Sequence, residues 1–147
     1  MILPDVNVLV YAHREDAVDH KQYKLWLEGI IKGGQPYGIS DHVLSGFLRI
    51  VTHPRVFTPA SPIRAAFEFA RQIREQPNCR VIALGARHWQ LFAGLCQPLS
   101  AAGNLIPDVW YAALAIESDC EWITTDRDYE QFPGLRWRHP LTGKASK

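Results

Sequence analysis

Two hydrophobic patterns alternate along this chain. Short apolar runs bounded by turn residues are typical of buried strands, whereas apolar positions three and four residues apart are typical of helices with one buried face. The predicted strands end near Asp5 and cover 37–39, 81–84, 121–124 and, at an edge, 135–138. A turn into a helix follows Asp5, and further helices are predicted over 23–31, 43–51, 63–73, 89–95 and 109–116.

Turn residues and caps separate these elements. Gly33-Gly34 stops the second predicted helix, Ser40 or Asp41 caps the next one, and Pro54 ends it. Strands that alternate with helices form a mainly parallel sheet with helices on both faces. We therefore expect an α/β fold, a three-layer α/β/α sandwich with a mainly parallel sheet of four to five strands.

Size and composition fit one domain. With 147 residues, 47% of them hydrophobic, the chain is expected to form a single domain over 1–141, followed by a flexible tail over 142–147. The formal net charge of +1 neither requires nor excludes nucleic acid, since a local basic rim is enough to bind it. There is no apolar stretch of the roughly 20 residues that cross a membrane, and no leader pattern. Three widely spaced cysteines suggest reduced thiols, so we expect a cytoplasmic protein.

Three aspartates carry the candidate chemistry. Asp5 and Asp126 follow predicted strands, so in a parallel sheet they lie on one rim, and Asp108 begins a helix. Two unit charges 4 Å apart repel by about 4 kcal/mol at an effective dielectric near 20, so such a cluster calls for a cation. Oxygen ligands suit Mg²⁺ or Mn²⁺, which activate water toward phosphodiesters. Taken singly, each aspartate is equally typical of a helix or turn cap; their joint placement favours a metal-dependent nuclease.

Four stretches carry a family resemblance: DVNVLVYA at 5–12, FLRIVTHP at 47–54, Pro107-Asp108 ahead of AALA at 112–115, and TTDRDY at 124–129. In this order and spacing the chain resembles the PIN-domain nucleases and, within them, the VapC toxins of bacterial toxin–antitoxin pairs. The resemblance covers nearly the whole chain. It implies a Mg²⁺- or Mn²⁺-dependent endoribonuclease that cleaves RNA through a metal-activated water. It also implies a homodimer, and inhibition by a cognate antitoxin that inserts a peptide near the acidic pocket.

The resemblance also assigns roles to individual residues. It implies that Asp5 and Asp108 are the principal metal ligands, and that Asp126 completes the pocket directly or through water. Asp128 is then a nearby fourth catalytic acid. Asn7 and Thr125 are expected to orient these carboxylates or a bound water.

Basic and aromatic residues near these motifs have two interpretations each. Arg49, Arg55 and Arg127 are candidates for holding RNA phosphates, which basic side chains do without reading sequence, or they are paired or solvated. Trp110 and Tyr111, beside Asp108, either stack on an unpaired base or pack in the core or a dimer interface.

One departure from the family pattern keeps a second function open. Most of the family carries a glutamate just before the Phe-Leu-Arg stretch, where this chain has Gly46. The alternative is therefore a catalytically weak or inactive protein that binds RNA or antitoxin. A phosphatase of the haloacid-dehalogenase type ranks third. Asp5-Val6-Asn7 lacks that family's second aspartate, and no lysine occurs between Lys32 and Lys144.

Overall fold

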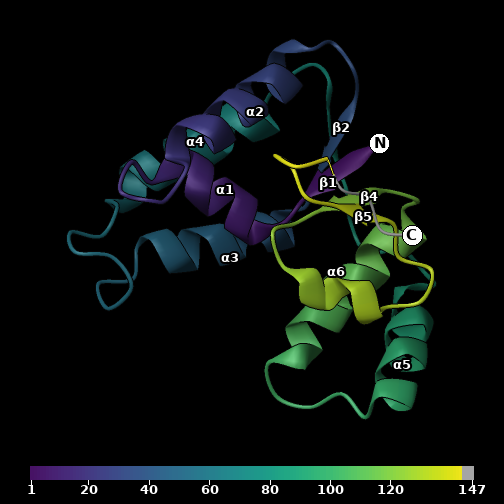
Figure 1. Cartoon of the computed structure of the whole chain (residues 1–147). Coiled ribbons are helices and arrows are strands. Elements are labelled where there is room, and N and C mark those ends of the chain that lie inside the picture. Colours follow the sequence, from purple (N-terminus) through teal and green to yellow (C-terminus); the bar gives the residue numbers. More distant parts are fainter. Residues whose placement is uncertain (144–147) are drawn as a thin grey trace.

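The computed structural model describes residues 1–143 and shows parallel strands between helices (Figure 1). Strands β1 (Ile2–Pro4), β4 (Glu121–Ile123) and β5 (Trp137–Arg138) form a parallel sheet in the order β1-β4-β5. Strands β2 (Tyr37–Ile39) and β3 (Cys79–Val81) pair in parallel, and β2 lies beside β1. Within the described residues these five short, parallel strands confirm the predicted fold class.

Six α-helices and a short 3₁₀ helix surround the strands in the described part of the chain. They are α1 (Val6–His13), α2 (His20–Lys32), α3 (Asp41–Val51), α4 (Ile63–Arg74), α5 (His88–Leu99), α6 (Leu105–Glu117) and the 3₁₀ helix η1 (Arg127–Gln131). Helix α1 packs against α2 and α3, and α3 packs against α4. Figure 1 shows α5 and α6 packed together on one side of the strands, away from α1, α2 and α4.

The core explains why the strands are short and apolar. Leu3, Ile39, Trp122 and Ile123 are fully buried, because helices cover the strands. Full burial of a large apolar side chain contributes roughly 1.5–3 kcal/mol, which fixes the strands against the helices. The polar residues that follow β1 and β4 therefore start from rigid positions.

Some predicted boundaries were wrong. The third strand was predicted over 81–84, but β3 ends at Val81, because its pairing with β2 sets Tyr37 opposite Cys79 and Ile39 opposite Val81. Leu84 is exposed, so the apolar run beyond Val81 ends on the protein surface and does not continue the strand. The last strand is shorter than 135–138, and η1 was not predicted.

Two findings concern the chain as a whole. Cys79, Cys96 and Cys120 are free thiols. In the part that the structure describes, no helix has the length and apolar character needed to cross a bilayer. Of the predicted flexible tail over 142–147, residues 144–147 lie outside the described residues.

Candidate functional site

Asp5 sits where β1 passes into α1. Its backbone N–H donates to the Ile123 carbonyl over 2.8 Å, which extends the pairing of β1 with β4 by one residue. Its Oδ1 accepts from the Val6 N–H at 2.6 Å and caps α1, and its Oδ2 accepts from the Thr124 hydroxyl at 2.6 Å. The residue is only 5% exposed. Asp5 is thus a buried carboxylate held from two sides.

Asp5, Asp108 and Asp126 share the wall of one cavity of about 170 Å³, called the acidic cavity below. Its wall comes from the start of α1, from α3, from α6 and from the chain after β4. The other residues that line it are Val6, Asn7, Gly46, Arg49, Ile50, Pro107, Tyr111 and Tyr129. The structure therefore brings together three acids that are far apart in the sequence.

The protonation equilibria show how closely these acids interact. Burial raises the pKa of Asp5 to about 6, against the hydrogen bonds from Thr124 and Val6, and the charges of Asp108 and Asp126 raise it further. Burial also raises the pKa of Asp108, as do the charges of Asp126 and Asp128, while a 3.3 Å hydrogen bond from the Tyr129 hydroxyl lowers it. Negative charge in this cavity is therefore unfavourable without a cation.

Thr124 is a site residue that the sequence analysis missed. Its Oγ1 donates to Asp5 and accepts from the Asp126 N–H at 3.1 Å, so one hydroxyl connects two of the acids. Thr125, which was predicted to orient the carboxylates, is absent from the cavity lining. A threonine two residues before an aspartate often accepts from its backbone N–H, and this signal points to Thr124.

Asp126 and Asp128 occupy the start of η1. The Asp126 Oδ1 accepts from the Asp128 N–H at 2.8 Å and caps this 3₁₀ helix. Asp128 is exposed and does not line the cavity, but its charge acts on Asp108. Asp126 therefore faces the cavity and Asp128 lies outside it.

Of the three arginines predicted to hold RNA, Arg49 lines the acidic cavity. Arg55 is exposed beyond the end of α3, and its backbone N–H donates to His53. Arg127 lies in η1, near enough to His139 to assist burial in lowering the pKa of that imidazole. Of these three arginines, Arg49 alone lines the acidic cavity.

The acids do not form a ready-made metal cage. Among residues 1–143, no three histidine, cysteine, aspartate or glutamate side chains are close enough to hold an ion between them. Gly46 lines the cavity and supplies no ligand. The donor set that remains consists of carboxylate oxygens, which fits a hard divalent cation that keeps several waters.

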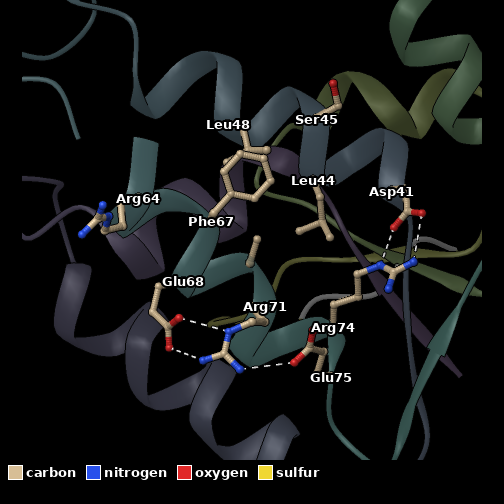
Figure 2. Close-up of a pocket in the computed structure, with 11 residues that line it drawn as sticks. Asp41, Leu44, Ser45, Leu48, Arg64, Phe67, Glu68, Arg71, Arg74 and Glu75 are labelled. Atoms are coloured by element: carbon tan, nitrogen blue, oxygen red, sulfur yellow. Dashed lines mark hydrogen bonds and ion pairs between the residues drawn. The ribbon is translucent and has the colours of Figure 1, made fainter. Parts of the chain in front are cut away.

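A larger cavity of about 650 Å³ lies between α3 and α4, and we call it the apolar groove. Figure 2 shows Leu44, Leu48 and Phe67 among its lining residues, and Phe67 is 57% exposed. Charged pairs surround them, with Asp41 bound to Arg74, and Arg71 bound to Glu68 and Glu75 (Figure 2). The groove has apolar walls and a charged rim, in which Asp41, Glu68, Arg71, Arg74 and Glu75 are paired.

Comparison with known proteins decides the family. A model of the PIN domain matches residues 2–135. Ribonuclease VapC43 of Mycobacterium tuberculosis is 41% identical over 145 residues, which are 99% of both chains. The chain is a VapC-type member of the PIN-domain family. Ribonuclease VapC25 of the same species is 36% identical over 140 residues, 95% of this chain and 99% of the relative. Membership of this family removes the support for the phosphatase alternative.

Solved structures of VapC proteins share the fold. The VapBC2 complex of Rickettsia felis, bound to a DNA fragment from its promoter, superposes with a TM-score of 0.70 at 19% identity, over 95% of this chain and 98% of that chain. VapC20 of Mycobacterium tuberculosis, a toxin that cleaves the sarcin-ricin loop, superposes with a TM-score of 0.63 at 17% identity, over 92% and 98%. At these identities the likeness establishes the fold.

Proposed function

We propose that this VapC-type protein is the toxin of a toxin–antitoxin pair and a Mg²⁺- or Mn²⁺-dependent endoribonuclease. The observation that carries the proposal is the shared cavity of Asp5, Asp108 and Asp126, in which burial and mutual repulsion raise the pKa of two of the acids. A divalent cation relieves that repulsion. The relatives named ribonuclease support RNA as the substrate.

Each acid has a defined part in this proposal. Asp5 and Asp108 would hold the ion, and Asp126 would complete its surroundings directly or through water. When bound, the ion lowers the pKa of a water and neutralises charge on the phosphodiester. Thr124 and the Val6 N–H fix the Asp5 carboxylate, and the Tyr129 hydroxyl fixes Asp108. These bonds hold the oxygens in place before an ion arrives.

The remaining predicted site residues would act around this centre. Asn7 and Arg49 line the cavity, where an amide can orient a water and a guanidinium can bind an RNA phosphate. Asp128 would draw the cation toward Asp108 by its charge. Arg55, Arg127 and Thr125 lie outside the lining, so any contact they make is with RNA beyond the cleaved bond.

Cleavage of purified transfer and ribosomal RNA tests the proposal. We expect cleavage with Mg²⁺ or Mn²⁺, loss of cleavage in EDTA, and loss in Asp5→Asn. Asp119→Asn is the matched control, because Asp119 is exposed and has a positive φ that asparagine tolerates. Cleavage that survives both EDTA and Asp5→Asn would come from a contaminating ribonuclease and would contradict the proposal.

Gly46 supports the alternative of a weak or inactive binding protein, since it stands where the family resemblance leads us to expect a glutamate and supplies no carboxylate. That alternative expects RNA binding without metal-dependent turnover, and a gain of turnover in Gly46→Glu. Substantial cleavage by the wild-type protein, not increased by Gly46→Glu, would exclude it.

We further propose a cognate antitoxin and a second copy of the chain as partners, in the cytoplasm. The structures of VapBC2 from Rickettsia felis and VapBC-1 from nontypeable Haemophilus influenzae support the antitoxin. The apolar groove offers a surface for an apolar antitoxin segment, and we expect Phe67→Glu to reduce co-purification with the antitoxin. Trp89→Glu is the control, because Trp89 is 67% exposed and lies outside the groove. Equal losses in both variants would argue against the groove.

A further inference from the structure

Tyr111 reaches the acidic cavity from α6. It lies three residues after Asp108, nearly one helical turn away, so both side chains lie on one face of the helix. Its ring stacks on Trp122, with centroids 5.5 Å apart and an interplanar angle of 19°, and His42 contacts it edge-on at 5.6 Å. Because these contacts fix the ring, the position of the hydroxyl is fixed as well.

The Tyr111 hydroxyl makes no hydrogen bond to any residue in the described range 1–143. Two buried phenols in the described range have protein partners: Tyr129 donates to Asp108, and Tyr37 donates to the Ile73 carbonyl. Tyr23 has none, but it packs on Tyr11 and does not line the acidic cavity. A half-buried hydroxyl without a protein partner is a donor available to whatever occupies the cavity.

Gly46 leaves room for the hydroxyl in this position. A Cβ at residue 46 would lie 3.2 Å from the Tyr111 Oη and 3.0 Å from the Val6 Cγ2. The first atom of a side chain there would already press on the phenol. The absence of a side chain at residue 46 and the position of the Tyr111 hydroxyl are therefore coupled, and a neutral donor stands beside the glycine.

We propose that the Tyr111 hydroxyl binds substrate by donating a hydrogen bond to a non-bridging oxygen of the RNA phosphodiester in the acidic cavity. Because this role needs an RNA phosphate there, it rests on the ribonuclease function proposed above. Burial raises the pKa of Tyr111, and the Asp5 charge adds to this, so the phenol remains a donor at neutral pH. Arg49, on the same wall, supplies the positive charge that the phosphate also requires.

Tyr111→Phe tests this role because it removes the hydroxyl and keeps the stacked ring. We expect kcat/KM for RNA cleavage to fall about 10- to 100-fold, as for a lost hydrogen bond to a charged group. The affinity for Mn²⁺, measured by electron paramagnetic resonance, should not change, since the phenol is not an ion ligand here. The matched control is Tyr11→Phe, because the Tyr11 ring packs on Tyr23 outside the cavity.

A second readout does not depend on turnover. Protein labelled with 3-fluorotyrosine gives a ¹⁹F resonance for each tyrosine, and the resonance missing from Tyr111→Phe belongs to Tyr111. Addition of a short single-stranded RNA with Ca²⁺ should shift this resonance and leave that of Tyr11 in place.

The outcomes separate the two proposals. If wild-type protein cleaves RNA and Tyr111→Phe cleaves it equally well, the role of Tyr111 is wrong and the ribonuclease function stands. RNA that shifts other tyrosine resonances but not that of Tyr111 also overturns the role. A wild-type protein that shifts Tyr111 on RNA addition but does not cleave supports the contact and contradicts the nuclease. A wild-type protein that shows neither RNA cleavage nor a shift of the Tyr111 resonance would contradict both proposals.

Discussion

Asp5→Asn should stabilise the metal-free protein, and more so as the pH rises. Burial raises the pKa of Asp5 from its ordinary 3.8 to about 6. Because one pKa unit is worth 1.36 kcal/mol, ionising Asp5 costs about 3 kcal/mol more in the folded protein than in the unfolded chain. A raised folded-state pKa contributes stability that is complete below 3.8 and is lost as the pH rises through about 6. Asparagine does not ionise, so Asp5→Asn does not lose this stability as the pH rises.

The assay is urea unfolding of wild-type protein and Asp5→Asn in EDTA at about pH 4 and pH 8. The difference in unfolding free energy should move in favour of the variant by about 2–3 kcal/mol between the two pH values. Other titrating groups change the stability of both proteins alike, so they cancel in the difference between the proteins. The altered bond to Thr124 acts equally at both pH values, so it cancels in the change of that difference with pH. Asp119→Asn, an exposed position, should show no such change.

Divalent metal completes this experiment. At pH 8, Mg²⁺ at about 100 times its Kd should stabilise the wild-type protein by about 2.7 kcal/mol and leave Asp5→Asn nearly unchanged.

In the metal-free experiment, a difference in unfolding free energy between the two proteins that is the same at pH 4 and pH 8 would refute the reasoning. It would mean that the Asp5 carboxylate is adequately solvated and that the cavity does not concentrate negative charge.

Three further predictions concern the neighbours of the acids. Gly46→Ala should lower the rate of RNA cleavage about tenfold by displacing the Tyr111 hydroxyl. In a Tyr111→Phe background the same substitution should lower the rate little further, and kinetic assays of the wild type, the two single variants and the double variant test this. Thr124→Val removes the hydrogen bond to Asp5, so the pKa of Asp5 rises and the pH profile of cleavage should move to higher pH; an unmoved profile contradicts that link. Arg49→Ala should weaken RNA binding and reduce its salt dependence, measured by titration at several salt concentrations.

Much of the fold follows from the sequence because the apolar periodicity and the turn residues indicate the same element boundaries. The helical spacing around Trp26 and the Gly33-Gly34 stop match α2, which ends at Lys32. The boundary of β3 could not be predicted, because it depends on the register with β2 rather than on the apolar run that begins at Val81.

The acids of the candidate site could be predicted because each breaks an apolar pattern at an element boundary. Asp5 directly follows β1, and Asp108 lies in the first turn of α6. The spacing of Thr124 before Asp126 is a sequence signal for a turn, but it does not reveal that the same hydroxyl donates to Asp5, a contact that needs the folded chain. The contact of Gly46 with Tyr111 joins two helices that are distant in sequence and needs the folded chain.

Crystals soaked in Mn²⁺ would test the central claim most directly. An anomalous difference peak between Asp5 and Asp108, absent from crystals of Asp5→Asn, is the predicted result. A well-ordered acidic cavity without such a peak at saturating Mn²⁺ would contradict a divalent-ion site and, with it, the metal-dependent ribonuclease.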